Sequence, residues 1–198
     1  EPEGAQIRSS KLKAAHEAMA QILAKHQGEP RAFTSDRNVA VIGGGPAGLA
    51  TAFFLTRAGV PVTIFEARDT LGGIVRHVIP EFRIATKDIE NDAELCLAFG
   101  AKVELNSRVE SVAELKDRGF TDVVVATGAW MPGSTGLGAD AELDVLEFLE
   151  AAKKNADELE LGSDVVVIGA GNTAMDAARV AKRGGAASVT LVYRRTRR

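Results

Sequence analysis

One glycine-rich pattern occurs twice in this chain and constrains its fold more than any other feature. The segment VAVIGGGPAGLA (39–50) aligns with VVVIGAGNTAMD (165–176) at a constant offset of 126 residues. The strands expected next, VTIFE (62–66) and VTLVY (189–193), also align, with one extra residue in the second copy. A strand, a glycine turn, a helix and a second strand are typical of a nucleotide-binding unit. The sequence therefore predicts an α/β fold with two Rossmann-like dinucleotide-binding units, the second incomplete.

The first turn has the spacing G-x-G-x-x-G, directly after an expected strand. Gly43 allows the tight turn, Gly45 lets a pyrophosphate approach the backbone, and Gly48 lets the helix pack against the sheet. The helix N-terminus offers unpaired N–H groups and a partial positive charge to phosphates. Glu66 ends the second strand, where a carboxylate can accept hydrogen bonds from a ribose. The alternative is a glycine-rich turn with a solvated glutamate.

The second turn reads G-x-G-x-x-A, with Ala174 at a helix-packing position that tolerates alanine. Tyr193 stands where the first unit has Glu66, and Arg194 and Arg195 follow it. An acid there would bind the 2′-hydroxyl of NADH, whereas arginine binds a 2′-phosphate through paired donors. We therefore favour NADPH over NADH. The alternatives are a solvated basic run and a nucleic-acid patch, although no aromatic stacking platform accompanies the arginines.

Composition and charge restrict the classes of partner. Apolar residues make up 45% and charged residues 26% of the 198 residues, which is ordinary for a globular protein with a sizeable core. The net charge of −3 gives no argument for nucleic acid or an anionic membrane. No apolar run approaches the roughly 20 residues of a membrane helix. We expect neither nucleic acid nor a membrane as a partner.

The sulfur and imidazole side chains provide no further chemistry. The only cysteine, Cys96, lies on an apolar helix face and is expected in the core, so a dithiol relay within this chain is excluded. The three histidines, His16, His26 and His77, do not cluster, and no metal site is predicted. The polar first residues and the single cysteine favour a cytoplasmic protein.

Two dinucleotide motifs in this order resemble those of the pyridine-nucleotide-dependent flavoprotein reductases. The finer resemblance is to the glutamate synthase small-subunit-like branch, which includes the flavin domains of dihydropyrimidine dehydrogenase. Within it, GGIVRHVIPEFR (72–83) looks most like the selenate-reductase-type flavoprotein subunit. The segments that carry the resemblance are 39–84, 123–130 and 165–195. It implies a fold of the pyridine nucleotide-disulfide oxidoreductase type, with FAD and NADPH as cofactors.

The resemblance also implies a role for each matching residue. The FAD pyrophosphate and ribose would lie on Gly43, Gly45, Pro46, Ala47, Gly48 and Glu66. Other parts of FAD would contact further residues: Gly72 and Gly73 at the diphosphate, Arg83 beside the flavin, Val109 (ending a strand) at the adenine, and Thr127 and Gly128 over the cofactor. NADPH would contact Gly169, Ala170, Gly171, Asn172, Thr173, Ala174, Arg194 and Arg195. No catalytic acid, base or nucleophile is expected. Residues 79–83 could instead form a proline-stiffened loop with Phe82 in the core, and residues 126–128 a small-residue turn.

The resemblance suggests how the chain is organised and used. We expect a fragment of a longer protein, divided into an N-terminal helix and linker (1–36), an FAD-binding domain (37–135), a linker helix (136–160) and the start of an NAD(P)H-binding domain (161–198). It would pass hydride from NADPH to FAD and onward to an iron–sulfur domain or subunit and a substrate-reducing subunit. Iron–sulfur clusters are expected only outside this fragment, which alone would be inactive. The alternative is a non-catalytic nucleotide-binding scaffold or redox sensor.

Overall fold

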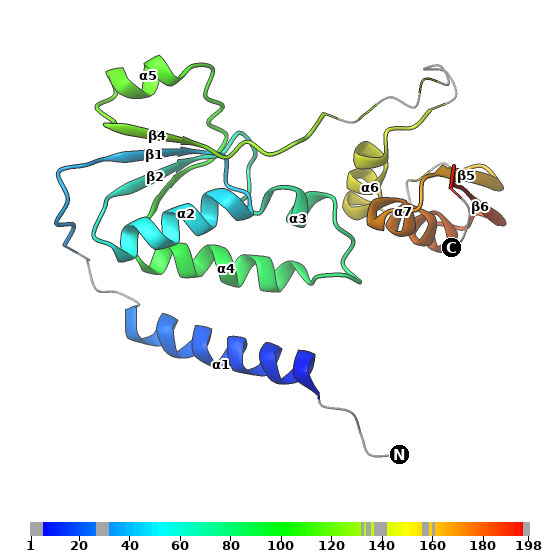
Figure 1. Cartoon of the computed structure of the whole chain (residues 1–198), viewed down its shortest axis with the longest axis horizontal. Helices are drawn as coiled ribbons and strands as arrows, with labels where there is room; N and C mark the ends of the chain where they lie inside the picture. The colour runs from blue at the N-terminus through cyan, green and yellow to red at the C-terminus, as the bar shows by residue number, and fades with distance from the viewer. Residues whose placement is uncertain are drawn as a thin grey trace. The chain divides into compact units, whose positions relative to one another are not determined.

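A parallel four-stranded sheet holds the first glycine turn at its carboxyl edge (Figure 1). The computed structural model describes residues 6–26, 32–131, 133, 136, 142–155, 159 and 161–195. The strands are β1 (Val39–Ile42), β2 (Val62–Phe65), β3 (Lys102–Glu104) and β4 (Asp122–Val125), in the spatial order β3-β2-β1-β4. Since all the pairs are parallel, the carboxyl ends of the strands meet at one edge, where such sheets bind ligands.

Helices cover both faces of this sheet. In Figure 1, α5 (Val112–Asp117) lies on one side, and α2 (Pro46–Arg57) and α4 (Thr86–Ala98) lie on the other. Helix α2 begins with proline, whose missing N–H costs nothing in the first turn. It is followed by Gly59 at a φ of +82°, the left-handed conformation common just after a helix. Helix α1 (Ile7–His26) precedes the sheet and is exposed over most of its length.

The core of this part of the chain fills the space between the sheet and its helices. One cluster joins buried aliphatic residues of β1 and β2 to α2 and α4, and includes Val41, Ile64, Ala52 and Cys96. On the other face, Phe65 and Leu115 pack together with Ala40. The central strands β1 and β2 are almost entirely buried, as parallel strands require, whereas the edge strands β3 and β4 are intermediate or exposed.

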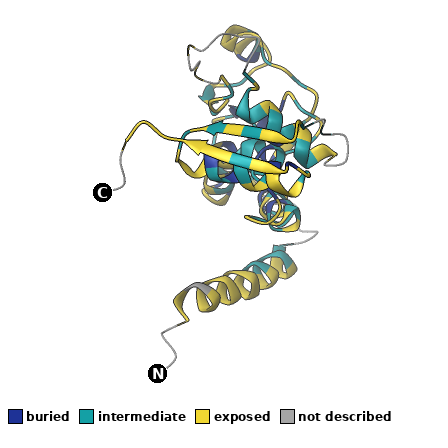
Figure 2. Ribbon diagram, turned by 90° about the vertical axis from the view of Figure 1, so that its right-hand side faces the viewer, coloured by how far each residue is buried: buried dark blue, intermediate teal, exposed yellow. Residues whose placement is uncertain are grey.

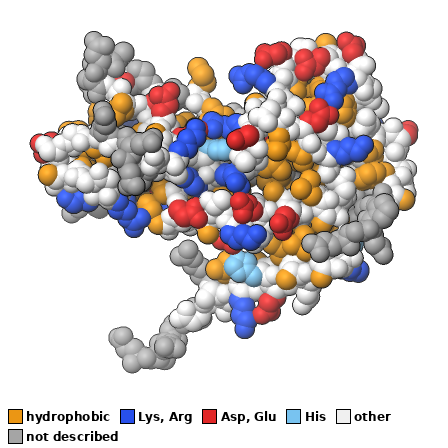
Figure 3. All heavy atoms as spheres, turned by 180° about the vertical axis from the view of Figure 1, so that it is seen from behind, with side chains coloured by type: hydrophobic (Ala, Val, Ile, Leu, Met, Phe, Trp, Pro, Cys, Tyr) orange, Lys and Arg blue, Asp and Glu red, His pale blue; other side chains and the backbone are white. Residues whose placement is uncertain are grey.

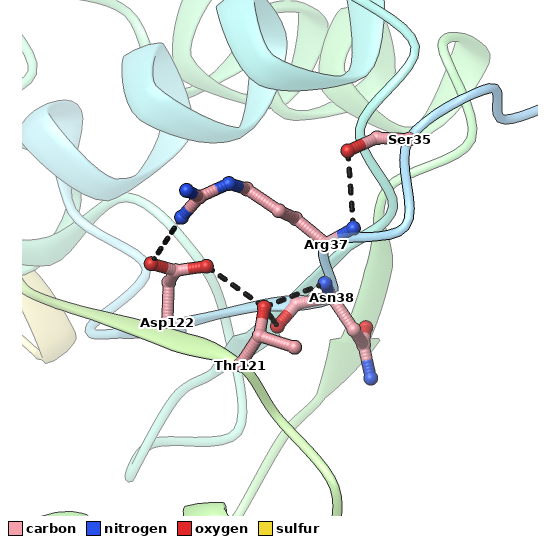
Figure 4. A network of polar contacts seen from close by, with 5 residues as sticks. All are labelled: Ser35, Arg37, Asn38, Thr121 and Asp122. Atoms are coloured by element: carbon pink, nitrogen blue, oxygen red, sulfur yellow. Dashed lines mark hydrogen bonds and ion pairs between the residues drawn. The ribbon is translucent and has the colours of Figure 1, made fainter.

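A polar network ties the opposite, amino edge of the sheet (Figure 4). The backbone N–H of Asn38 donates to the hydroxyl of Thr121 at 2.9 Å, and Arg37 pairs with Asp122 at 2.7 Å. The Thr121 hydroxyl also donates to the Asp122 carboxylate at 2.8 Å. The hydrogen bond from Thr121 is the main cause that lowers the pKa of the Asp122 carboxyl, and the hydrogen bond from Arg37 is the second. These contacts join the starts of β1 and β4 at the edge away from the glycine turn.

The second glycine turn belongs to a separate strand pair. Strands β5 (Asp164–Ile168) and β6 (Ser188–Val192) are parallel, and α7 (Asn172–Arg183) connects them. Helix α6 (Val145–Lys154) packs on α7 around the buried Leu149 and Ala177. Figure 2 shows the two strands in front, coloured exposed or intermediate along their length.

Contacts divide the chain into two compact units, which we call unit 1 and unit 2. Unit 1 holds Glu1–Leu71 and Glu90–Thr127, and unit 2 holds Gly72–Ile89 and Gly128–Arg198. Residues 72–89 thus belong to unit 2, whereas we predicted that 37–135 form one domain. The predicted domain boundaries stay a prediction.

Backbone conformation decides two local features of the sheet's surroundings. Between β2 and α4 the chain forms the one-turn helix α3 (Gly73–His77), whose N-cap Gly72 takes the left-handed conformation. Strand β3 ends at Glu104, and the chain turns at Asn106, where φ is +53°. Every helix in the described part of the chain is too short or too polar to cross a bilayer. Acidic and basic side chains are intermixed on the face drawn in Figure 3.

Candidate functional site

The first glycine turn brings together the carboxyl ends of three strands. Gly43 follows β1 with a φ of +107°, and its N–H donates to the carbonyl oxygen of Phe65, the last residue of β2, at 2.8 Å. A Cβ on Gly43 would overlap the carbonyl oxygen of Ala126, which follows β4. Only glycine meets both demands, because other residues rarely adopt this φ and have no room for a side chain.

The start of α2 meets the back of this turn. A Cβ on Gly48 would overlap the carbonyl oxygen of Gly43 and lie 3.3 Å from the Val41 side chain. Gly48 therefore allows the close approach of helix and strand that we predicted for the third glycine. The geometric reasons for Gly43 and Gly48 are thus confirmed, while their contact with a pyrophosphate stays a prediction.

The N-terminus of α2 presents backbone donors. Gly45 is the N-cap, with extended dihedral angles (φ −78°, ψ −176°) and no side chain to cap the helix. The first intrahelical hydrogen bond runs from Leu49 N–H to Gly45 O at 2.9 Å. The N–H groups of Ala47 and Gly48 precede it and have no partner within the helix. Pro46 and Ala47 are exposed, so an anion can reach this turn.

Glu66 holds the turn from the end of β2. It is 8% exposed, and its Oε2 accepts a hydrogen bond from Gly44 N–H at 2.7 Å, while Oε1 accepts one from Arg68 N–H at 2.9 Å. A Cβ on Gly44 would overlap the side chain of Leu71. We did not single out Gly44, although its place within GGG was the available signal. Each carboxylate oxygen keeps a further lone pair, so a ribose hydroxyl can still donate to Glu66.

The second turn repeats this geometry 126 residues later. Gly169 has a φ of +133°, and its N–H donates to Val192 O at 2.8 Å, as Gly43 does to Phe65. Gly171 is the N-cap of α7 (φ −78°, ψ 176°), and Met175 N–H bonds to its carbonyl at 3.0 Å. These equivalent dihedral angles and hydrogen bonds confirm the internal repeat.

The second turn is open. A Cβ on Gly171 would have no atom within 4 Å, and Ala170, Asn172 and Thr173 are exposed. Ala174, in place of the third glycine, is buried at 8% exposure. A Cβ on Gly169 would lie 3.3 Å from the Cβ of Ala174, so this turn has room for one methyl group where the first has none.

The residue after β6 differs from its counterpart after β2. Tyr193 takes the place of Glu66 and is 51% exposed, and Arg194 and Arg195 beyond it are exposed. The second unit therefore has a tyrosine in place of Glu66, followed by two solvent-exposed arginines. Their contact with a 2′-phosphate stays a prediction.

One expected feature of the first unit is wrong. We placed Val109 at the end of a strand, but β3 ends at Glu104. The chain leaves the sheet early because Asn106 N–H donates to Arg68 O at 2.9 Å and Ser107 N–H to Glu66 O at 2.8 Å. Val109 instead packs against the core cluster below this loop. Whether its backbone meets an adenine stays a prediction.

The remaining predicted residues are distributed over both units. Thr127 is exposed, and its Cα lies 3.2 Å from the ideal Cβ position of Gly43, beside the first turn. Gly72, Gly73 and Gly128 all have positive φ, at +118°, +56° and +75°. Arg83 lies in unit 2, where its Nε donates to the Asp176 carboxylate at 2.6 Å. Their roles toward FAD stay predictions.

A comparison with protein families decides the family. The model of the family described as "Pyridine nucleotide-disulphide oxidoreductase" matches residues 37–198. This chain belongs to that family. The match spans both glycine turns and confirms the FAD/NAD(P)-binding α/β fold class that the repeat predicted.

Relatives within this oxidoreductase family narrow the branch. A protein named YgfK of Escherichia coli strain K12 is 44% identical over 85% of this chain. The NADP(+)-dependent formate dehydrogenase subunit beta of Moorella thermoacetica is 36% identical over 85%, and the glutamate synthase [NADPH] small chain of E. coli K12 is 35% identical over 80%. These names confirm the glutamate synthase-like resemblance. The chain spans only 17%, 25% and 37% of the three relatives' lengths.

Solved structures give the same fold. A 2-naphthoyl-CoA reductase in complex with 2-naphthoyl-CoA superposes with a TM-score of 0.67 at 25% identity, over 81% of this chain and 24% of that one. A thioredoxin reductase of Lactococcus lactis gives a TM-score of 0.58 at 20% identity, over 81% of this chain and 57% of that one. The latter likeness concerns the fold alone.

The single cysteine of this family member is a core residue. Cys96 is 3% exposed, and its thiol donates to Leu49 O at 3.1 Å. Burial raises the pKa of this thiol to about 11. It therefore stays protonated near neutral pH, which does not suit a redox nucleophile. Among the described residues, no three His, Cys, Asp or Glu side chains come together as a metal site would require.

Proposed function

We propose that this chain is the electron-input part of an NADPH-dependent flavin oxidoreductase. FAD would occupy the first turn, in the domain predicted over 37–135, and NADPH the second, in the domain that begins at 161. The observation that carries the proposal is the repeated geometry: two extended glycine N-caps, each at the start of a 12-residue helix and at the carboxyl end of a parallel strand. Such helix starts bind diphosphates through backbone amides.

The first turn suits FAD because it combines an anion site with a carboxylate. Gly43 to Gly48 would hold the pyrophosphate against the amides of α2, and Glu66 would accept hydrogen bonds from the adenosine ribose. Glu66 already holds Gly44 at 2.7 Å, so the two features form one connected site. Gly72, Gly73, Arg83, Val109, Thr127 and Gly128 would complete it, as the resemblance implies.

The second turn suits NADPH because no carboxylate follows β6. Residues 169–174 would hold its diphosphate on α7, and Arg194 and Arg195 would bind the 2′-phosphate through charge-assisted hydrogen bonds. Tyr193 offers no acceptor pair for the two ribose hydroxyls of NADH. The relatives whose names specify NADP(+) or NADPH support this choice.

The protein's part in the reaction is to bind and orient. Bound FAD would supply the hydride and electron chemistry, so no side chain of this chain need act as an acid, base or nucleophile. An iron–sulfur domain or subunit and a substrate-reducing subunit would receive the electrons, outside this chain. Relatives named as subunits or small chains are consistent with such partners.

Anaerobic reduction of the FAD-loaded full-length protein tests this function. Adding NADPH should bleach the yellow flavin absorbance, and NADH should do so more slowly. Replacing Arg194 and Arg195 together by glutamine should narrow the difference between the two donors. Arg108→Gln is the control, because Arg108 is an exposed arginine paired with Glu110 in unit 1. FAD binding without bleaching would overturn the enzyme and leave a binding scaffold or redox sensor.

A further inference from the structure

A buried carboxylate on α7 is bound to a loop far away in the sequence. Asp176 is 7% exposed, two residues beyond Ala174 of the second turn. Its Oδ1 accepts a hydrogen bond from Arg83 Nε at 2.6 Å, and Arg179, one turn further along α7, lies 4.0 Å away. A buried carboxylate needs such a partner, because removing the cation leaves an uncompensated charge. The two paired residues are 93 positions apart and both lie in unit 2.

The same loop contacts the rest of unit 2 at further points. The guanidinium of Arg183, in the last turn of α7, lies over the Phe82 ring at 4.2 Å from its centroid. From α6, Lys153 Nζ donates to Ile79 O at 2.6 Å and to Val75 O at 3.3 Å. Burial is the main cause that lowers the pKa of Lys153. We call residues 75–83, which comprise the end of α3 and the loop after it, the clamped loop.

The ion pair joins the clamped loop to the helix that carries the second turn. Asp176 lies in the second turn of α7, whose N-terminal amides form the proposed NADPH site. A ligand that binds only the folded form suppresses opening of the elements that form its site. If the loop opens together with α7, the same ligand suppresses opening of the loop.

We propose that Asp176 is a positioning residue that holds Arg83, and with it the clamped loop, on α7, the helix of the proposed NADPH site. Arg83 would then be fixed from the second site, although the resemblance implies a place beside the flavin. The loop would respond to nucleotide bound at residues 169–174. This response rests on the proposed function, whereas the attachment of the loop by Asp176 does not.

Hydrogen exchange measured by mass spectrometry on the whole protein tests both parts. Without nucleotide, Asp176→Asn and Arg83→Gln should each speed amide exchange in peptides covering 75–83 by about tenfold. Arg83→Lys, which keeps the charge, should restore most of the protection. Asp122→Asn is the matched control, because it breaks a 2.7 Å Arg–Asp pair in unit 1 and should leave these peptides unchanged. Unchanged exchange in both Asp176→Asn and Arg83→Gln would overturn the attachment.

Adding NADP⁺ tests the response of the loop. In the unaltered protein it should slow exchange in 169–179 and in 75–83 together, whereas in Asp176→Asn it should slow exchange in 169–179 only. If the ion pair were purely structural, Asp176→Asn would not alter how much NADP⁺ slows exchange in 75–83. Protection of 169–179 without 75–83 in the unaltered protein would overturn the response. No protection at 169–179 would instead refute the proposed NADPH site and leave the attachment to the nucleotide-free comparison. If Asp176→Asn unfolds unit 2, exchange rises throughout 161–195 and Arg83→Gln decides.

Discussion

Replacing Glu66 by glutamine should loosen the first glycine turn. The carboxylate accepts backbone N–H bonds from Gly44 at 2.7 Å and Arg68 at 2.9 Å, and its residue is 8% exposed. Hydrogen bonds to a charged group contribute roughly 1.5–3 kcal/mol each. Glutamine keeps one acceptor and turns an NH₂ group toward the other N–H. We therefore expect the local free energy of opening to fall by about 2–4 kcal/mol.

Glu104→Gln is the control for this change. Glu104 lies on the neighbouring strand β3 and pairs with Arg118 at 2.6 Å, but both side chains are about half exposed (40% and 47%). Such a pair is worth about 0–1 kcal/mol. The assay is amide exchange of Gly44, which should become at least about 30-fold faster in Glu66→Gln and change little in Glu104→Gln. Equal exchange of Gly44 in the two variants would refute the structural role of Glu66.

Three further predictions follow from individual distances and burial. Gly48→Ala should lower the free energy of unfolding of unit 1 by about 1–3 kcal/mol in urea, because its Cβ would overlap Gly43 O. Ala174→Gly, the reverse change at the equivalent position, should lower the stability by only about 1 kcal/mol. Equal losses in the two variants would contradict the packing argument. Gly171→Ala should leave the melting temperature unchanged, since its Cβ meets no atom within 4 Å. In calorimetry it should weaken NADP⁺ binding by about tenfold or more and leave FAD binding unchanged. Unaltered NADP⁺ affinity would argue against a diphosphate at this turn. Cys96 should resist alkylation at pH 8 in the folded protein. Because the folded pKa of about 11 exceeds the ordinary 9.0, the folded state holds the extra proton between these values, so stability should fall by about 2–3 kcal/mol as pH rises from 9 to 11, and Cys96→Ala should remove that loss.

The sequence predicts the parts of the fold that obey local rules. The glycine turns at 43–48 and 169–174 follow from φ requirements and helix starts, which involve neighbouring residues only. Gly59 marks the end of α2 for the same reason. The β–α–β order of each unit also agrees with the parallel strands, because parallel neighbours need a crossover connection such as a helix. Fold class and turn geometry therefore follow from local sequence.

The contacts that the sequence did not predict involve residues far apart in the chain. Nothing near Arg83 indicates a carboxylate 93 residues away, and Asp176 in a helix could equally have been a solvated residue. The early end of β3 depends on backbone hydrogen bonds from residues 106 and 107 to Arg68 and Glu66, just after β2. Val109 was misplaced for that reason. The bond from Gly44 to Glu66 spans 22 residues and needed the register of β1 beside β2.

Binding stoichiometry tests the central claim most directly. Calorimetric titration of the apoprotein with FAD, and then of the FAD-loaded protein with NADP⁺, should give one molecule of each per chain, with neither displacing the other. Gly171→Ala should weaken only the second titration. Competition between FAD and NADP⁺ for a single site, or the absence of a second binding event, would contradict two separate nucleotide sites.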